Sequence, residues 1–465
     1  MQQRVDLLFH QQKTSRTSNT LLEVRQRIHH LKKLKDVIHR YEPEIFKALS
    51  ADLRKSKFEA AVTEIYFVYS EIDFALKNLS RWVRPQRAKS TVSSLFTKNR
   101  IIYEPKGNCL IIAPWNYPFQ LTMSPLVSAL AAGNSVIIKP SEYSPHTAAV
   151  LATILDEAFD KSVVACIQGG QEVSEALLKL PFDHIFFTGS TPVGKIVMRA
   201  AAEHLSTITL ELGGKSPVLI DPSADLEKTA EKVAWGKLIN AGQTCIAPDY
   251  VLLHHSQEKE FIHYFSAAAT RLIYRENGMI DPDTYAKIIN TRHMSRLQLL
   301  LEDAIGKGAE VVWQGDNDLE DSIPPTLLRK VNIESRIMEE EIFGPLLPLV
   351  TYTDLDEALD FVQSKPKPLA LYIFSSNTKS TQHIIKSTSA GGTCVNDVIL
   401  HVSNPHLPFG GVNHSGMGGS HGYFGFKAFS HERSVMYQSR IPISKLIYPP
   451  YSKKGWVLKF LKRWM

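Results

Sequence analysis

Cysteine is scarce in this sequence of 465 residues, with four thiols at positions 109, 166, 245 and 394. No two of them form a C-x-x-C pair, which excludes the usual zinc and dithiol redox motifs and fits a reducing compartment. Long apolar runs are also absent: no stretch of about 18 apolar residues occurs, and the amino-terminal stretch lacks the apolar core of a signal peptide. We therefore expect an intracellular, cytoplasmic protein.

Excess charge is small as well. The sequence has 53 Lys and Arg against 47 Asp and Glu, a formal net charge of +6, which is far below the charge density of nucleic-acid-binding domains. We therefore expect no nucleic-acid partner. With 44% hydrophobic residues, the chain is long enough for two or three domains with a cleft between them.

The amino-terminal part is predicted to be helical. The stretch "TLLEVRQRIHHLKKLKDVIHRYEPEIFKAL" is predicted to be one amphipathic helix, because apolar residues recur at helical spacing from Leu21 to Ile38 and Thr20 with Glu23 forms a capping box at the start. A second helix is expected from about Phe58 to Leu79. The polar stretch after it, up to about residue 100, is predicted to be either a connector or an edge hairpin.

From residue 101 on, short apolar runs alternate with helical stretches. The first set is "IIYE", "CLIIA", "SVIIKP", "VVACI", "HIFFTGS", "TITLELGG" and "PVLID", and the second is "YVLLHH", "AEVVWQG", "LLPLVTY", "LALYIFSS" and "GTCVND". Strands separated by helices indicate βαβ units and largely parallel sheets. The sequence therefore predicts two α/β domains, with ligands bound beyond the carboxyl ends of the strands.

One strand end is rich in glycine. Gly189, Ser190 and Gly194 in "FFTGSTPVGK" follow an apolar run and open a helix, where backbone N–H groups can bind a phosphate. The stretch nearly matches the P-loop, but Ile196 stands where a hydroxyl must bind magnesium. ATP or GTP chemistry is therefore disfavoured.

Other strand ends carry single side chains that could react or bind a ligand, and each of them can also be interpreted as an ordinary structural residue. Lys139 and Glu142 in "VIIKPSE" are either ligand contacts or exposed turn residues, and Glu211 in "LELGGKSP" is either a general base or a solvated carboxylate. Cys245 in "NAGQTCIAPDY" is either a nucleophile or a small, inert hydrophobic residue.

Two further sequence patterns do not indicate a catalytic or metal site. "GGSHG" fits the G-x-S-x-G of a hydrolase elbow, but a glycine-rich loop precedes it rather than the apolar strand that such an elbow needs. Four histidines in the same region, at positions 401, 406, 414 and 421, lack metal-ligand spacing, so no metal site is predicted.

Read together, the motifs "PWNYP", "KPSE", "FTGSTPVGK", "LELGGKSP", "GQTCIAPD", "EEIFGP" and "PFGGVNHSGMG" resemble the aldehyde dehydrogenase superfamily in order and spacing, from about residue 15 to 440. The short amino terminus and the ending "GMGGSHGYFGFKAFSHERSV" resemble the class 3 branch, which includes fatty and aromatic aldehyde dehydrogenases. Two positions depart from that branch, Ser420 where an aromatic residue is common and Tyr423 where a lysine is common.

The resemblance implies a covalent mechanism. Cys245 would attack the aldehyde, Asn116 with the Cys245 backbone N–H would hold the oxyanion, and Glu211 would activate water to hydrolyse the thioester to the acid. A non-catalytic relative would have lost one of these three residues. An enzyme that passes the thioester to CoA or phosphate generally lacks the glutamate.

The resemblance also implies a nicotinamide cofactor, NAD with NADP as a second possibility, and a homodimer. Phe409 would line the aldehyde tunnel. The adenosine ribose of the cofactor would contact Lys139 and Glu142, and the pyrophosphate would lie near Gly189, Ser190 and Gly194. The nicotinamide ribose would contact Glu341 and Phe343. The expected division is a cofactor domain at 1–80 and 101–210, a catalytic domain at 211–395, a bridging element at 81–100 and 396–440, and a tail at 441–465.

The tail ends in "KKGWVLKFLKRWM", which has five positive charges and no acid. On a helix its aromatic and aliphatic residues share one face, as in helices that lie in a membrane interface. The alternatives are membrane contact on the cytoplasmic side, or a tail that packs on a dimer partner or stays in solvent.

Overall fold

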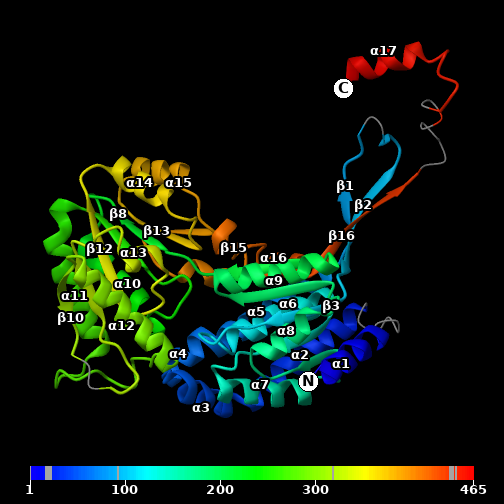
Figure 1. The fold of residues 1–465 in the computed structure, drawn as a ribbon. Helices are drawn as coiled ribbons and strands as arrows, with labels where there is room; N and C mark the ends of the chain where they lie inside the picture. Colours follow the sequence, from blue (N-terminus) through cyan, green and yellow to red (C-terminus); the bar gives the residue numbers. More distant parts are fainter. Residues whose placement is uncertain are drawn as a thin grey trace.

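Three β-sheets organise the computed structural model, which describes residues 2–15, 23–91, 94–316, 319–438, 445 and 448–464. A six-stranded and a seven-stranded sheet, each with its own helices, lie side by side, and a three-stranded sheet projects from the first of them (Figure 1). The predicted α/β fold with two parallel-dominated parts and a small additional element is confirmed.

The six-stranded sheet has the order β15-β7-β6-β3-β4-β5 and is parallel except for β15. Its strands are β3 (Asn108–Ile112), β4 (Ser135–Lys139), β5 (Val164–Cys166), β6 (His184–Gly189), β7 (Thr207–Leu212) and β15 (Gly416–Met417). Strands β3 and β4 are buried throughout, because helices cover both faces of a parallel sheet.

Alternation along β3 divides the core of this part in two. Cys109 and Ile111 face one apolar cluster, whereas Leu110 and Ile112 face another. The first cluster packs against α2 (Val24–Arg40), α3 (Glu42–Leu53), α5 (Tyr66–Trp82), α6 (Gln120–Ala132), α7 (Pro145–Ala158) and α16 (Gly422–Ala428). The second packs against α1 (Gln2–Ser15), α8 (Gln171–Leu178) and α9 (Thr191–His204).

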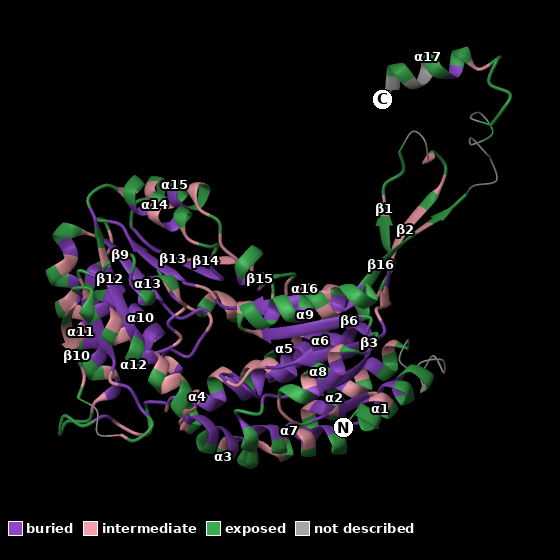
Figure 2. Ribbon diagram, in the orientation of Figure 1, coloured by how far each residue is buried: buried purple, intermediate pink, exposed green. Residues whose placement is uncertain are grey.

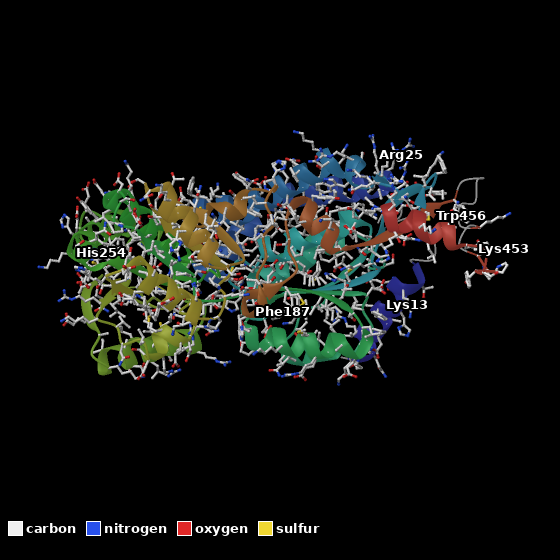
Figure 3. The ribbon with its side chains drawn as sticks, turned by 90° about the horizontal axis from the view of Figure 1, so that it is seen from above. Lys13, Arg25, Phe187, His254, Lys453 and Trp456 are labelled. Atoms are coloured by element: carbon white, nitrogen blue, oxygen red, sulfur yellow. The ribbon has the colours of Figure 1, made fainter. Side chains whose placement is uncertain are left out.

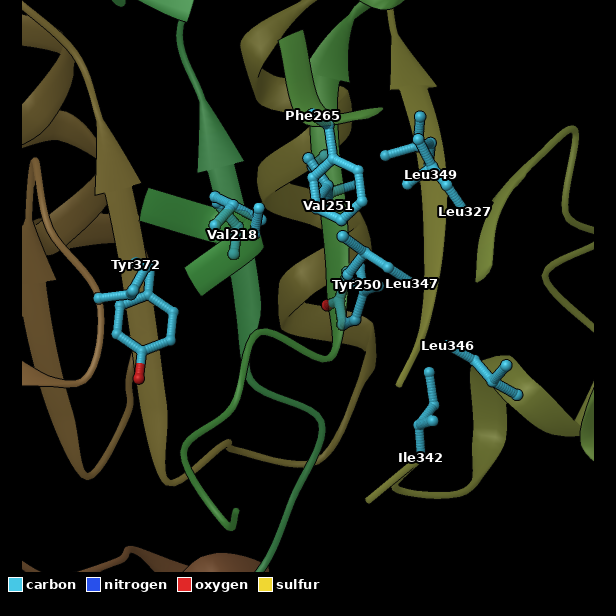
Figure 4. Close-up of a cluster of buried hydrophobic side chains, with 14 of the residues drawn as sticks. Val218, Tyr250, Val251, Phe265, Leu327, Ile342, Leu346, Leu347, Leu349 and Tyr372 are labelled. Atoms are coloured by element: carbon cyan, nitrogen blue, oxygen red, sulfur yellow. The ribbon is translucent and has the colours of Figure 1, made fainter. Parts of the chain in front are cut away.

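The seven-stranded sheet has the order β10-β11-β12-β9-β8-β13-β14, with only β10 antiparallel. Its strands are β8 (Pro217–Ile220), β9 (Tyr250–His254), β10 (Glu310–Gln314), β11 (Thr326–Arg329), β12 (Leu346–Tyr352), β13 (Ala370–Phe374) and β14 (Gly392–Val395). Val218, Val251 and Leu347 from adjacent strands lie in one cluster with Phe265 (Figure 4).

The helices of this part are α10 (Leu226–Leu238), α11 (Glu258–Ile273), α12 (Thr291–Gly306), α13 (Arg336–Glu339), α14 (Leu355–Ser364) and α15 (Thr378–Ser387). Buried residues concentrate on the strands, and the outward faces of the helices are exposed (Figure 2). The chain passes between the two large sheets at the link from β7 to β8, through Gly213 and Gly214.

The three-stranded antiparallel sheet corrects one prediction. "IIYE" was expected in a parallel sheet, but it lies in β2 (Lys98–Pro105), between β1 (Gln86–Ala88) and β16 (Ser430–Tyr437). Its burial is incomplete along the strand, as expected of a sheet with only one covered face. The expected boundary after residue 100 therefore cuts a strand, whereas the edge hairpin before it is confirmed by the β1–β2 pairing.

The amino-terminal helices also differ from the prediction. The expected single helix ends at Arg40, and Pro43 lies in the first turn of α3, a position where proline is favoured. Thr20 lies outside the described residues, and Glu23 caps α2 without a side-chain hydrogen bond. The second expected helix is α4 (Lys57–Ala60), a π-helical turn η3 (Ala61–Ile65) and α5 in succession.

The carboxyl-terminal segment ends in α17 (Gly455–Trp464), which lies away from the rest of the molecule beyond the three-stranded sheet (Figure 1). Seen from above, Lys453 and Trp456 lie at the opposite end of the view from His254 (Figure 3). Trp456 is exposed and Val457 is buried, and the side chains of Phe460, Leu461 and Trp464 lie outside the described residues. No helix within the described ranges is long and apolar enough to cross a membrane.

Candidate active site

A cavity of about 590 Å³ lies between the two large sheets. The six-stranded part contributes the loop after β3, the turn from β6 into α9 and the end of β7, and the seven-stranded part contributes the loops that carry Cys245, Glu341 and Phe343, together with α12. In the six-stranded sheet the cavity therefore lies beyond the carboxyl ends of parallel strands, as the sequence predicts. In the seven-stranded sheet the prediction is wrong, because Cys245 precedes β9 and Glu341 and Phe343 precede β12, at the amino ends of these strands.

The loop before Cys245 has an unusual backbone. Asn240 and Ala241 adopt φ of 50°, and Gly242 has φ of 74°. A Cβ on Gly242 would lie 2.3 Å from the Gly344 carbonyl oxygen, so both the conformation and the close approach require glycine. The Gln243 side chain donates to the carbonyls of Asn240 and Lys287 at 3.0 and 2.9 Å, which fixes the loop just before the thiol.

The Cys245 thiol is partly exposed in this cavity. Burial raises the pKa of Cys245, and the Glu341 and Glu211 carboxylates raise it further, while the backbone N–H groups of Cys245 and Ile246 oppose the shift. The thiol is therefore protonated at neutral pH in this structure, and a base or a positive charge must assist its ionisation.

Glu211 lies on β7, where it pairs in register with Gly416 of β15. Its side chain is buried, and neither carboxylate oxygen has a hydrogen-bond partner that meets normal geometry within the described part of the chain. Burial raises the pKa of Glu211 to about 8, and the nearby Ser420 side chain opposes part of the rise. The carboxylate is therefore a base of near-neutral strength.

Asn116 lies in the loop after β3 and is buried. Its side-chain Nδ2 donates to the Gln243 carbonyl at 3.0 Å, and its own carbonyl accepts from Asn240 Nδ2 at 2.9 Å. A side-chain amide has two N–H donors, so the second N–H of Asn116 is available to a ligand beside Cys245, which lines the same cavity.

The predicted phosphate site lies at the same cavity. Gly189 and Ser190 line it at the end of β6, directly before α9. Gly194 is not among the lining residues; a Cβ there would lie 2.7 Å from Leu212 Cδ2, so this glycine lets α9 pack closely on β7. The free N–H groups at the start of α9 favour an anion.

The Glu341–Phe343 segment is fixed by charged side chains. Arg296 donates to the carbonyls of Glu341 and Ile342, and the Ile342 N–H donates to Asp249 at 2.9 Å. Burial and the Asp249 carboxylate raise the pKa of Glu341 to about 8.

The cavity has groups that suit the nicotinamide and pyrophosphate parts of a dinucleotide cofactor. The Glu341 Oε1 atom is buried without a partner among the described residues, and it lines the cavity beside Phe343. Lys139 and Glu142 form an ion pair at the end of β4 and are not among the lining residues. They are linked to the cavity through Tyr143, whose ring centroid lies 6.4 Å from that of His293.

Sequence reasoning missed three residues that line the cavity. Trp115 lies with its ring centroid 4.9 Å from that of His293 and 5.3 Å from that of Phe343, and Arg296 lines the same wall. Burial lowers the pKa of His293 to about 4. Trp115 could have been found from its place beside Asn116 in "PWNYP", whereas His293 and Arg296 lie on α12 without a recognisable motif.

A second, smaller cavity adjoins the first. Its lining is largely apolar and includes Phe186, Pro125 and Phe409, together with Ser420 and His421. Four residues line both cavities, namely Leu121, Thr188, Glu211 and Cys245. The thiol and the unpartnered carboxylate therefore lie where the two cavities meet.

The arrangement is that of an α/β protein in which a thiol and an unpartnered carboxylate lie where a cavity of about 590 Å³ meets a smaller apolar one. The Aldehyde dehydrogenase family profile matches residues 3–435, and the chain belongs to this family. It is therefore an enzyme that oxidises aldehydes to carboxylic acids with NAD(P).

Individual relatives agree with this assignment. The chain is 44% identical to 4,4'-diaponeurosporen-aldehyde dehydrogenase of Staphylococcus aureus, over 98% of each chain. It is 44% identical to Aldehyde dehydrogenase family 3 member A2 of Mus musculus, over 94% of this chain and 90% of the relative. The substrate-bound structure of Staphylococcus aureus AldH has a TM-score of 0.94 and 42% identity and covers 98% of this chain and 99% of the other.

The raised pKa of Glu211 predicts a pH-dependent stability. A carboxyl group with a folded-state pKa near 8 and an ordinary unfolded-state pKa stabilises the fold fully at low pH, and this stabilisation is lost as the pH rises through 8. In the unaltered protein the free energy of unfolding should therefore decrease as the pH rises from about 5 to 8. Glu211→Gln should make this decrease smaller, by up to about 1.4 kcal/mol per pH unit.

Denaturant unfolding of both proteins across this range measures the difference. Glu104→Gln, which removes a partly exposed carboxylate paired with Arg433, serves as the control for the loss of a carboxylate elsewhere. Parallel curves for the Glu211 variant and the unaltered protein would contradict the assigned pKa.

Proposed function

We propose that Cys245 is the nucleophile of the reaction. Its sulfur adds to the aldehyde carbon, the carbonyl oxygen gains negative charge, and the thiol proton leaves to a base. The proposal is supported by the position of the thiol, since Cys245 lines both the dinucleotide-sized cavity and the apolar one. A substrate carbon at this point is within reach of both.

We assign the oxyanion to two N–H donors, the free Asn116 side-chain N–H and the Cys245 backbone N–H. The bond from Asn116 Nδ2 to the Gln243 carbonyl holds the amide plane, so the remaining N–H is aimed before the charge develops. An amide also carries no charge, and therefore it does not trap the oxyanion as a permanent ion pair.

NAD(P), when bound, accepts the hydride. Glu341 and Phe343 would hold the nicotinamide ribose, Gly189 and Ser190 the pyrophosphate, and Lys139 with Glu142 the adenosine ribose, while Gly194 sets the position of α9. We propose NAD as the preferred form, because the Glu142 carboxylate is 36% exposed and would repel a 2'-phosphate.

Glu211 would complete the reaction by taking a proton from water, so that the hydroxide attacks the Cys245 thioester and releases the carboxylic acid. A base with a pKa of about 8 is strong enough to activate water near neutral pH, whereas an ordinary carboxylate is too weak. The same residue argues against transfer of the acyl group to CoA or phosphate.

The apolar cavity indicates the substrate class. Phe186, Pro125, Leu121 and Phe409 bring hydrocarbon surface next to Cys245, and burial of such surface favours medium or long aliphatic, aromatic or terpenoid aldehydes. The S. aureus relative named for 4,4'-diaponeurosporen-aldehyde is consistent with a terpenoid chain. An absorbance assay of reduced cofactor with short, long and aromatic aldehydes, and with NAD and NADP in parallel, compares these classes directly.

We propose a homodimer formed through the bridging element. Strands β1 and β16 are the edges of the projecting sheet, and neither has a further neighbour in the described part of the chain. Met436 and Tyr437 on β16 are more than half exposed. Unpaired edges with exposed apolar side chains favour association with a second chain.

We propose that the tail contacts an anionic membrane. Trp456 and Leu458 are exposed, 59% and 70% respectively, and the basic side chains of Lys459, Lys462 and Arg463 are exposed on the same short helix. A helix with this composition lies in the interface plane, and each basic residue near an anionic surface contributes about 1 kcal/mol.

Cys245→Ala should abolish aldehyde oxidation, because alanine cannot form the thioester. Cofactor affinity should be unchanged, because the methyl side chain leaves the cavity walls in place. Cofactor fluorescence and the absorbance assay measure the two properties separately. Substantial turnover by this variant would refute the mechanism.

Glu211→Gln should give a rapid burst of reduced cofactor that then stalls, because acylation proceeds but the thioester is not hydrolysed. A stopped-flow trace with excess aldehyde records both phases. Steady turnover at the normal rate would exclude Glu211 as the hydrolytic base.

Liposome flotation tests the tail. The full chain should float with vesicles that contain anionic lipid, and a chain ending at Tyr451 should not, while neutral vesicles should retain neither. Equal flotation of the two chains would contradict membrane contact through residues 453–465.

A further inference from the structure

A fully buried ion pair lies behind the cavity wall, outside the residues that line the cavity. Lys55 Nζ contacts Glu64 Oε1 at 2.6 Å, and both side chains have no exposed surface. Burial raises the pKa of Glu64, and the charge of Lys55 opposes the rise. The sequence analysis did not single out either residue.

The pair occupies an irregular part of the helical layer. Lys55 lies in the link between α3 and α4, and Glu64 lies in the π-helical turn η3, between α4 and α5. A π-turn adds a residue to the helix and is frequent at functional sites. Here the side chain of Glu64 points inward toward the loop after β3.

The further hydrogen bonds of the pair go to the loop after β3 and to the start of α6. Lys55 Nζ donates to the Asn116 carbonyl at 3.0 Å and lies 3.8 Å from the centre of the Tyr117 ring. The N–H groups of Phe119 and Gln120 donate to Glu64 Oε2 at 3.0 and 2.9 Å. The cation therefore binds the middle of the loop, and the anion binds the turn where the loop enters α6.

The same segment also binds the loop that precedes Cys245. Glu59 on α4 accepts from the Asn240 N–H at 3.0 Å, and Asn240 Nδ2 donates to the Asn116 carbonyl at 2.9 Å. The Asn116 carbonyl thus accepts from both Lys55 and Asn240. One helical segment sets the distance between the amide and the thiol.

Stability alone is a poor explanation for this pair. Removing two charges from water costs several kcal/mol per ion, and an apolar pair of the same size is often at least as stable. Charge-assisted hydrogen bonds are short and directional, however. They suit a group that must be held in place, since a displacement of about 1 Å in a reacting group can slow a reaction by about 100-fold.

We propose that Lys55 and Glu64 are positioning residues, which fix the loop at Asn116 so that its side-chain amide meets the developing oxyanion. The proposal rests on the oxyanion role of Asn116 proposed above. Neither residue touches the substrate, so their effect must pass through Asn116.

A double-mutant cycle with Asn116 tests the proposal. The rate of cofactor reduction is measured in a single turnover, with enzyme in excess over aldehyde. Lys55→Met should lower this rate by about 100-fold without changing cofactor affinity. In an Asn116→Ala background the same change should have little further effect, because the residue through which Lys55 acts is gone.

A second variant and a control separate positioning from stability. The double variant Lys55→Met/Glu64→Gln removes both charges, so it can be measured even if Lys55→Met alone does not fold. Its single turnover should be as slow as that expected for Lys55→Met. Asp52→Asn is the control, because this buried carboxylate accepts from the N–H groups of His146 and Thr147 at the start of α7. It should lower the melting temperature without slowing the single turnover.

The outcomes are distinct. If Asn116→Ala is slow but the Lys55 variants reduce the cofactor at the normal rate, positioning is refuted and the proposed function stands. If the effects of Lys55→Met and Asn116→Ala are independent and multiply, Lys55 acts through general stability and positioning is again refuted. If Asn116→Ala itself reacts normally, the oxyanion assignment fails and this proposal fails with it.

Discussion

Two hydrogen bonds join the two large parts of the molecule at the point where the chemistry is assigned. The Asn116 side chain donates to the Gln243 carbonyl, and the Asn240 side chain donates to the Asn116 carbonyl. The two sheets share no paired strand, so the relative position of the amide and the thiol depends on such loop contacts. The left-handed backbone at Asn240 and Ala241 is tolerated because these bonds overdetermine it.

Burial shapes the electrostatics of the same cavity. A thiol and two carboxylates lie close together, and the pKa of each of Cys245, Glu211 and Glu341 is raised chiefly by loss of solvent. Each ionised group disfavours ionisation of its neighbours. A cation that enters the cavity favours the ionised form of all three. The loss of solvent that keeps the Cys245 thiol protonated therefore also raises the basicity of the Glu211 carboxylate.

The sequence predicted the parts of this structure that depend on local pattern. Buried parallel strands have continuous apolar runs, and the motifs around Glu211 and Cys245 indicated that the two residues share one site. Other features depend on long-range packing. The apolar pattern of "IIYE" is the same for a strand in an antiparallel sheet as for one in a parallel sheet. In the sequence, Lys55 and Glu64 resemble an ordinary exposed pair, because no neighbouring residue shows that the loop after β3 covers them. The sequence also could not predict that Lys139 and Glu142 are not among the residues that line the cavity.

The meeting point of the two cavities has a consequence for the order of events. Cys245 and Glu211 line both cavities, of which the apolar one has a volume of about 30 Å³ and the other about 590 Å³. In the proposed reaction an acyl chain on the thiol would extend toward the apolar cavity, which would have to widen to hold it. Water would then approach the thioester from the side of the larger cavity. In the proposed reaction this side would also hold the cofactor, so hydrolysis would follow movement of the cofactor away from the thioester.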